Sequence, residues 1–278
     1  MLEAPTLNII GAGHLGQTLG RLWAAGQQVG VGHILNRTPQ STEAAIAFIG
    51  AGQAATSIAT LPSADITLIA TPDAYIADCC AALAASGTLN ANSIVFHCSG
   101  ALSSSVLSTA AAQGAAVASV HPVRSFAQPA QTAANFNGTL CGVEGDARAL
   151  EILARCFGAI GASFVTIAAE HKVLYHAAAV FACNYLVTLQ DVAQTTYGKA
   201  GIAPDVALRL MEPLVRETID NIFSKGPAQA LSGPIARGDF ATVDRQQQAL
   251  SLWRDDYAGL YQAFATLTTG LAAQRQQP

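Results

Sequence analysis

The 278-residue chain carries little charge: Asp, Glu, Lys and Arg make up 12% of it, about half the usual ~25%. Hydrophobic residues make up 51%, and this combination excludes an intrinsically disordered chain. Basic side chains are outnumbered, 14 against 18, and the net charge of −4 argues against nucleic-acid binding through phosphates. We expect so apolar a chain to hide part of its surface in an oligomer.

Membrane, targeting and metal-binding signals are also missing. The most apolar run, residues 177–189, contains Asn184 and is shorter than the ~20 residues of a membrane span. The first residues lack the basic region of a signal peptide. None of the six cysteines belongs to a CxxC pair or a zinc-spaced cluster. We therefore expect a cytoplasmic protein with no membrane partner, no metal and no disulfide framework.

Residues 1–167 alternate between short β-rich runs and alanine-rich helical stretches, which predicts an α/β domain with a doubly wound parallel sheet of the Rossmann type. The expected strands are residues 7–10, 31–36, 66–70, 93–97, 117–119, 139–143 and 164–167. Helical stretches between them include residues 16–25, 42–50, 74–85 and 147–157. Residues 168–278 lack strand signals and predict an all-α domain with helices over 169–199, 203–224 and 243–271.

The sharpest motif is GAGHLG at residues 11–16, a G-x-G-x-x-G pattern between the first expected strand and the first expected helix. In that context the glycines permit a tight turn and close approach of a pyrophosphate, and the helix start attracts its phosphates. The alternative is a glycine-rich turn with a structural role only. We assign dinucleotide binding to Gly11, Gly13, His14, Leu15 and Gly16.

The second expected strand ends in Asn36-Arg37-Thr38, without the carboxylate that contacts the ribose 2′-hydroxyl in NAD-binding proteins. The Arg37 guanidinium can pair with a 2′-phosphate, and Asn36 and Thr38 can donate hydrogen bonds to it. Unless Arg37 is only an exposed loop charge, the sequence predicts NADP as the cofactor.

Two further strand ends are expected to line the cofactor cleft, because ligands of an open parallel sheet lie beyond the carboxyl ends of its strands. Asp73 follows the expected strand over residues 66–70, and it can either cap the next helix or take part in the chemistry. The residues assigned to the cleft are Ala70, Thr71, Pro72, Ser99 and Gly100.

Three side chains are candidates for moving a proton, and histidine is the commonest choice near neutral pH. His121 follows the fifth expected strand. Lys172 and His176 lie about 40° apart on a helix and share one stripe. Each has a structural alternative: His121 packs against Pro122, His176 is a core histidine, and Lys172 is solvated or salt-bridged.

Substrate contacts are expected from four polar side chains. Arg237 can clamp a carboxylate or pair with Asp239 to fix its own loop. Asn184 lies about 12 Å along the helix beyond His176. We therefore expect it to orient the cofactor or the substrate and not to contact the same reacting atom as His176. The assigned residues are Ser99, Ser125, Asn184 and Arg237.

Longer segments carry a family resemblance: HPVRSF at 121–126, HKVLYHAAAVFACNYLV at 171–187 and SGPIARGD at 232–239. With the glycine motif, they resemble a family of NADP oxidoreductases that joins a Rossmann-like domain to a helical domain of unknown function. More distantly, the chain resembles pyrroline-5-carboxylate reductase, ketopantoate reductase, 6-phosphogluconate dehydrogenase and prephenate dehydrogenase. The resemblance implies the fold, NADP and a homodimer formed through the helical domain, but no substrate.

One departure from these relatives bears on mechanism. Their hydroxyacid dehydrogenases place a Lys and an Asn four residues apart, whereas here His176 stands at that distance from Lys172. The sequence thus predicts an NADP(H)-dependent oxidoreductase that transfers hydride to or from a small carbonyl or imine, one that bears a carboxylate. The alternative is a non-catalytic NADP sensor.

Overall fold

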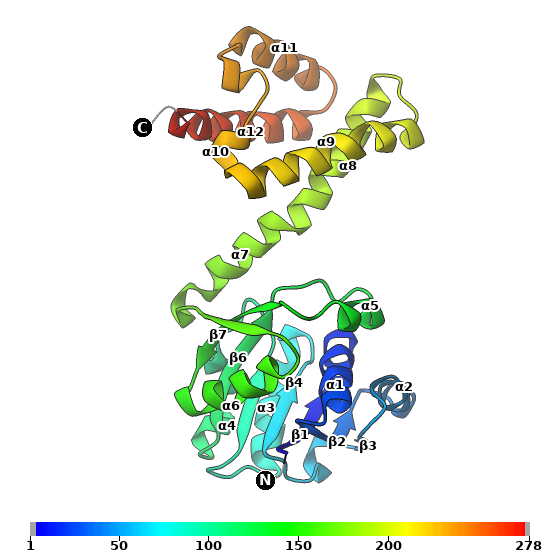
Figure 1. The fold of residues 1–278 in the computed structure, drawn as a ribbon, viewed down its shortest axis with the longest axis vertical. Helices are drawn as coiled ribbons and strands as arrows, with labels where there is room; N and C mark the ends of the chain where they lie inside the picture. The colour runs from blue at the N-terminus through cyan, green and yellow to red at the C-terminus, as the bar shows by residue number, and fades with distance from the viewer. Residues whose placement is uncertain (1–3, 276–278) are drawn as a thin grey trace. The chain divides into compact units, whose positions relative to one another are not determined.

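The computed structural model describes residues 4–275, which form two compact units that divide between Val180 and Phe181. The first unit is built on an eight-stranded sheet with the order β3-β2-β1-β4-β5-β6-β7-β8 (Figure 1). Neighbouring strands are parallel except β6 and β7, which are antiparallel. The strands are β1 (Thr6–Ile10), β2 (Gly30–Leu35), β3 (Gln53–Ala54), β4 (Ile66–Ile69), β5 (Ile94–His97), β6 (Ala116–Pro122), β7 (Leu140–Gly145) and β8 (Ser163–Thr166).

Two hydrophobic cores lie on the two faces of this sheet, because successive strand side chains point to opposite sides. Ile9 and Phe96 pack in one core with α1 and α6, and Ile10 and Val95 pack in the other with α3 and α4. The helices of this unit are α1 (His14–Gly26), α2 (Pro39–Ile49), α3 (Ile76–Ala85), α4 (Ser108–Ala112), α5 (Pro129–Ala134), α6 (Ala147–Gly158) and most of α7 (Lys172–Ala182), with short 3₁₀ turns η1 (Ile58–Thr60), η2 (Asp73–Tyr75), η3 (Ser104–Leu107) and η4 (Ala169–His171).

The second unit is helical and buries few side chains of its own. Its buried hydrophobic residues are Ala207, Met211, Val243, Tyr257 and Ala258. An apolar pocket of about 640 Å³ opens between α8, α11 and α12. The helices are α8 (Asn184–Lys199), α9 (Pro204–Lys225), α10 (Pro227–Ala230), α11 (Phe240–Ser251) and α12 (Asp255–Gln274), with a 3₁₀ turn η5 (Ile235–Arg237).

The predicted fold class is confirmed, and the structure corrects it in detail. The sheet is not wholly parallel, because β7 runs antiparallel to β6; an antiparallel neighbour needs no helical crossover. The edge strand β3 was not expected. The helix predicted over 169–199 is interrupted at Cys183, whose φ of −122° and ψ of −67° are not helical.

The helix predicted over 243–271 is two helices. Arg254 is extended between α11 and α12. Asp255 and Asp256 follow in the first turn of α12, where carboxylates interact favourably with the helix dipole and favour a new start.

The prediction placed the domain boundary at residue 167, whereas the compact units divide after Val180. The difference arises because the beginning of α7 packs on the sheet. Lys172 bonds to Ser119 of β6, and Tyr175 bonds to His121 of the same strand.

One helical stretch, Ala169–Lys199, is long and apolar enough to cross a membrane by length and composition. Its most apolar window has a mean hydropathy of 1.3 and none of it is buried. Length and composition alone do not distinguish a membrane span from a surface that another protein chain covers. The absence of a membrane partner therefore stays a prediction.

Candidate active site

The glycine-rich turn between β1 and α1 has the shape that dinucleotide binding requires. Gly11 has a φ of +87°, and a Cβ there would lie 2.7 Å from Cγ2 and 2.8 Å from N of Thr71. Only glycine therefore fits at this position. Gly16 also packs tightly, since its Cβ would lie 3.2 Å from the Gly11 carbonyl oxygen and 3.5 Å from Cβ of Ala70.

The backbone at Gly13 in this turn is open. A Cβ built on Gly13 meets no atom within 4 Å, so nothing in the described chain requires glycine there. The α1 N-terminus has no side-chain cap and no acidic residue in its first turn, which leaves the N–H groups of His14, Leu15 and Gly16 for an anion. Thr71 Oγ1 beside the turn is buried, and its one weak contact is with the Cys79 thiol.

The turn after β2 divides its three candidate residues into two kinds. Asn36 donates its side-chain amide to the Ser41 carbonyl at 2.8 Å. Thr38 caps α2, where its hydroxyl accepts from the Ser41 N–H at 3.2 Å. Arg37 is exposed, and no hydrogen bond or ion pair holds it within residues 4–275. Of the three, Arg37 alone has its side chain free for a 2′-phosphate.

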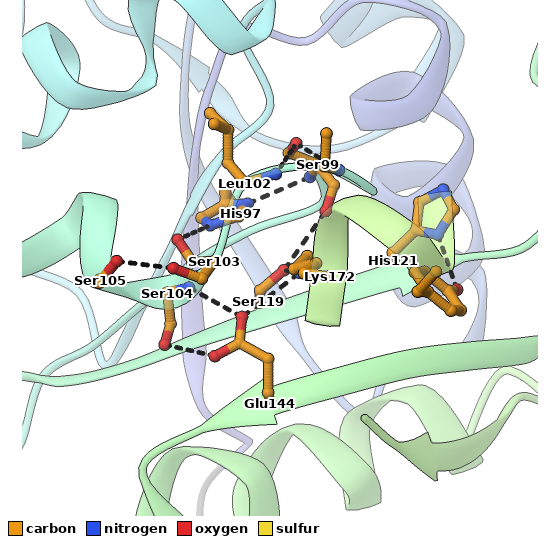
Figure 2. Close-up of polar contacts among 12 residues, drawn as sticks. His97, Ser99, Leu102, Ser103, Ser104, Ser105, Ser119, His121, Glu144 and Lys172 are labelled. Atoms are coloured by element: carbon orange, nitrogen blue, oxygen red, sulfur yellow. Dashed lines mark hydrogen bonds and ion pairs between the residues drawn. The ribbon is translucent and has the colours of Figure 1, made fainter. Parts of the chain in front are cut away.

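The hydroxyl of Ser99, assigned to cofactor and substrate, is already fully bonded. It donates to Asp73 at 2.7 Å and accepts the N–H groups of Ala101 and Leu102 at 3.2 and 2.9 Å. Figure 2 shows Ser99 and Leu102 of this cluster beyond β5. Asp73, which follows Pro72, thus ties the ends of β4 and β5 together, and the Ser99 hydroxyl has no bonding capacity left for a ligand.

Two predicted proton carriers meet at Gly100. A Cβ on Gly100 would lie 2.5 Å from Nδ1 of His176 and 3.0 Å from Nε2 of His121. The two imidazole rings are 5.9 Å apart at an interplanar angle of 81°. His176 Nδ1 is buried without a hydrogen-bond partner in the described chain. Both rings therefore line the carboxyl end of β5, where a substrate is expected.

His121 is uncharged at neutral pH. Burial, helped by the neighbouring His176 and Lys172, lowers the pKa of His121 from 6.5 to about 4. Its Nδ1 lies 2.8 Å from the hydroxyl of Tyr175. Sequence reasoning did not single out Tyr175, although it directly precedes His176 in the 171–187 segment.

Lys172 occupies a different position from the two histidines. Its side chain is 1% exposed, and its ammonium donates to the Ser119 hydroxyl and lies 3.3 Å from Oε1 of Glu144 (Figure 2). Glu144 also accepts from the N–H and hydroxyl of Ser104 at 2.8 and 2.7 Å. Burial lowers the pKa of Lys172, against the opposing effect of Glu144. In this structure Lys172 is therefore salt-bridged, which is one of the structural alternatives that the sequence left open for it.

His97 extends this polar network and was given no role by the sequence. Its Nδ1 accepts the Ser99 N–H at 3.1 Å, so its proton lies on Nε2, 3.2 Å from the Ser103 carbonyl oxygen (Figure 2). Burial lowers the pKa of His97 to about 4. His97 holds the β5 end as an uncharged side chain.

The remaining substrate candidates are exposed. Ser125 lies in the loop after β6, and its carbonyl accepts from the Thr132 hydroxyl at 3.1 Å. Asn184 begins α8 in the second unit, and Arg237 ends η5. Asp239 does not pair with Arg237 within residues 4–275; it caps α11 through the Thr242 N–H at 3.1 Å. These assignments stay predictions.

Comparisons with known proteins agree with this architecture. Residues 3–122 match a Rossmann-like domain, and residues 139–268 match the domain of unknown function DUF2520. Among curated proteins there is no match.

Three solved structures resemble the whole chain. Protein TM1727 from Thermotoga maritima is 27% identical, with a TM-score of 0.77 over 98% of this chain and 100% of its own. A "putative NADP oxidoreductase" from Bacteroides fragilis is 19% identical, with a TM-score of 0.77 over 97% and 100%. A pyrroline-5-carboxylate reductase from Coxiella burnetii is 12% identical, with a TM-score of 0.58 over 99% and 100%.

The fold and the glycine turn define a two-part α/β protein of the Rossmann-like class, similar in fold to NAD(P)-dependent oxidoreductases. Within that class, the chain is similar to a Rossmann-like domain over residues 3–122 and to DUF2520 over residues 139–268, the two-part arrangement that its sequence predicted.

The ion pair at Lys172 makes a testable prediction about stability. Lys172→Met leaves Glu144 buried without its cation, so we expect unfolding free energy to fall by about 3–5 kcal/mol. Lys172→Met with Glu144→Gln should recover most of that loss. Denaturant unfolding measures both, with Lys225→Met on the exposed end of α9 as the control. A Lys172→Met variant as stable as the parent would contradict the prediction.

Proposed function

We propose that this protein is an NADP(H)-dependent oxidoreductase that acts on a small carbonyl or imine substrate bearing a carboxylate. The observation that carries the proposal is the open space over Gly13 beside an uncapped α1 N-terminus, with two imidazoles at the carboxyl end of β5 in the same unit. Hydride chemistry is supplied by the nicotinamide when NADP(H) is bound.

The residues of this chain would divide the remaining tasks. Backbone N–H groups at the start of α1 bind the pyrophosphate, and Gly13 leaves the room for it. Arg37 pairs with the 2′-phosphate. His121 and His176 hold the proton that the substrate heteroatom gains or loses, and Gly100 lets both rings come close.

Paired variants test the cofactor site. Gly13→Ala meets nothing in the protein, so it should fold normally and yet weaken NADPH and NADH binding at least tenfold, because its methyl group occupies the pyrophosphate space. Arg37→Ala should weaken NADPH binding by about 10–100-fold, the value of a charged hydrogen bond, and leave NADH binding within about twofold. Calorimetric titration measures each affinity.

Gly158→Ala and Arg209→Ala serve as matched controls. Gly158 also has open space around its Cβ position, and Arg209 is an exposed arginine of α9. If Arg37→Ala weakened the binding of NADPH and of NADH equally, the assignment of Arg37 to the 2′-phosphate would be refuted. If the Gly13→Ala variant bound NADPH and NADH as tightly as the parent protein, the pyrophosphate site would be refuted.

Turnover separates an enzyme from a sensor. We expect the protein to oxidise NADPH with a member of a panel of 2-oxo acids and cyclic imines. His176→Ala should lower kcat by about 10²-fold or more, the usual contribution of a proton carrier, while NADPH affinity stays unchanged. The sensor alternative predicts a protein that binds NADPH tightly and reduces no panel member. Replacing both His121 and His176 would then leave its NADPH affinity and its other measured properties unchanged.

We also propose that the protein is a homodimer formed through its helices. Large apolar side chains are exposed along α7, α8 and α9: Val173, Leu174, Phe181, Tyr185, Val187, Leu208, Leu210, Leu214 and Phe223. The second unit also holds the apolar pocket of about 640 Å³ between α8, α11 and α12. A second copy would cover these side chains, because large exposed apolar side chains in such number mark an interface in most water-soluble proteins.

Sedimentation at micromolar concentration without detergent should give a dimer, and Val187→Glu should shift it to monomer. Leu252→Glu is the control, since Leu252 is 91% exposed in the turn between α11 and α12. A monomeric parent protein would refute the dimer. A parent protein that stays in solution only with detergent would instead favour a membrane partner.

A further inference from the structure

Tyr175 bonds to Nδ1 of His121, whereas Nε2 and Cε1 are the atoms of this ring nearest Gly100. The phenol oxygen lies 2.8 Å from Nδ1, and the two rings meet edge to face at 5.6 Å and 90°. Gly142, directly opposite His121 in the β6–β7 ladder, makes room for the phenol. A Cβ on Gly142 would overlap the Tyr175 hydroxyl and lie 2.5 Å from its Cζ.

The Nε2–Cε1 edge of the same imidazole lies toward the expected substrate position. Nε2 and Cε1 of His121 lie 3.0 Å from the position of a Gly100 Cβ. The two nitrogens of one ring therefore have different neighbours: the phenol at Nδ1, and the carboxyl end of β5 at Nε2. Figure 2 shows His121 set apart from the network around Lys172 and Glu144.

The charged and titratable groups around this pair come from three elements. His176 and Lys172 approach His121 from α7, and Asp73 approaches it from η2. On β7, Cys141 lies near Tyr175, and Glu144 balances Lys172. Burial raises the pKa of Tyr175, so near pH 7 the phenol keeps its proton while His121, with its pKa of about 4, carries only one.

An uncharged imidazole is a poor acid by itself. If Nε2 gave up its only proton, the ring would be left as an anion inside the protein, at a high energetic cost. If Nδ1 gains a proton from the phenol as Nε2 loses one, the negative charge moves to the phenol oxygen, which is a far weaker base than imidazolate and holds that charge at lower cost. Tyr175 is in hydrogen-bond contact with Nδ1 and can supply that proton.

We propose that Tyr175 is a positioning residue that acts through His121 by supplying a proton to Nδ1 while Nε2 donates to the substrate. The Tyr175 O–H bond breaks and the Nδ1–H bond forms, while the Nε2–H bond breaks and a bond from that proton to the substrate nitrogen or oxygen forms. His121 ends as the other neutral tautomer, and Tyr175 ends as a phenolate that regains a proton from solvent. The proposal rests on the proposed function and runs in reverse for oxidation.

The pH dependence of Tyr175→Phe tests the relay. With NADPH and a reducible panel member, we expect kcat at pH 7 to fall at least tenfold and NADPH affinity to stay within about twofold. The remaining activity should rise about tenfold for each pH unit between 7 and 5, because imidazolium needs no relay and its fraction grows by that factor. The ratio of parent to variant rates then narrows toward pH 5. A ratio independent of pH would overturn the relay and leave Tyr175 a structural role.

Gly142→Ala is a second variant that keeps both side chains. Its methyl group should displace the phenol from Nδ1, so it should reproduce the pH profile of Tyr175→Phe. Gly198→Ala in α8 and Tyr185→Phe are the matched controls, because a Cβ on Gly198 meets nothing within 4 Å and Tyr185 is half exposed in the second unit. Both controls should keep the parent profile.

A measurement without substrate keeps this proposal distinguishable from the proposed function. Nitrogen-15 NMR of histidine-labelled protein, assigned with His121→Gln, should show the His121 proton on Nε2 and a hydrogen bond accepted at Nδ1 that Tyr175→Phe removes. A proton on Nδ1 in the parent protein would overturn the relay even if NADPH is oxidised. Failure of every panel substrate would instead count against the proposed function.

Discussion

A buried ammonium group determines how the candidate active site is assembled. Leaving a charged side chain in the interior without a partner costs several kcal/mol, so Lys172 must meet Glu144 and Ser119. This requirement fixes the rotation of α7 about its own axis at its first residue. Tyr175 and His176, three and four residues further on, lie on the same helical stripe and must face β6. The ion pair therefore positions side chains with which it makes no bond.

Glycine residues supply the complementary half of this arrangement. Gly100 and Gly142 stand where any other side chain would collide with the rings that converge on them. Neither has a backbone conformation that requires glycine, so the space they leave is what matters. Gly11, by contrast, needs both the positive φ and the missing Cβ to let the turn fold against Thr71.

The sequence predicted what local pattern determines. The alternation of strands and helices and the GAGHLG turn both predicted the fold, because period and glycine spacing are local properties. The role of Lys172 stayed open because its partner Glu144 is far along the chain and no local signal pairs them. Tyr175 was missed for the same reason. Its contact with His121 depends on how α7 is rotated against β6, which periodicity along one element does not specify.

The low charge content of the chain gives this site its electrostatic character. Among the described residues, the buried Asp, Glu, Lys and Arg side chains are Glu144 and Lys172. Burial lowers the pKa of His121, and His176 and Lys172 lower it further. A neighbouring cation that disfavours imidazolium must, by the same Coulomb interaction, favour negative charge on nearby groups. Burial therefore makes Lys172 a fixed cation, paired with Glu144 and close enough to His121 to disfavour imidazolium, instead of a solvated side chain.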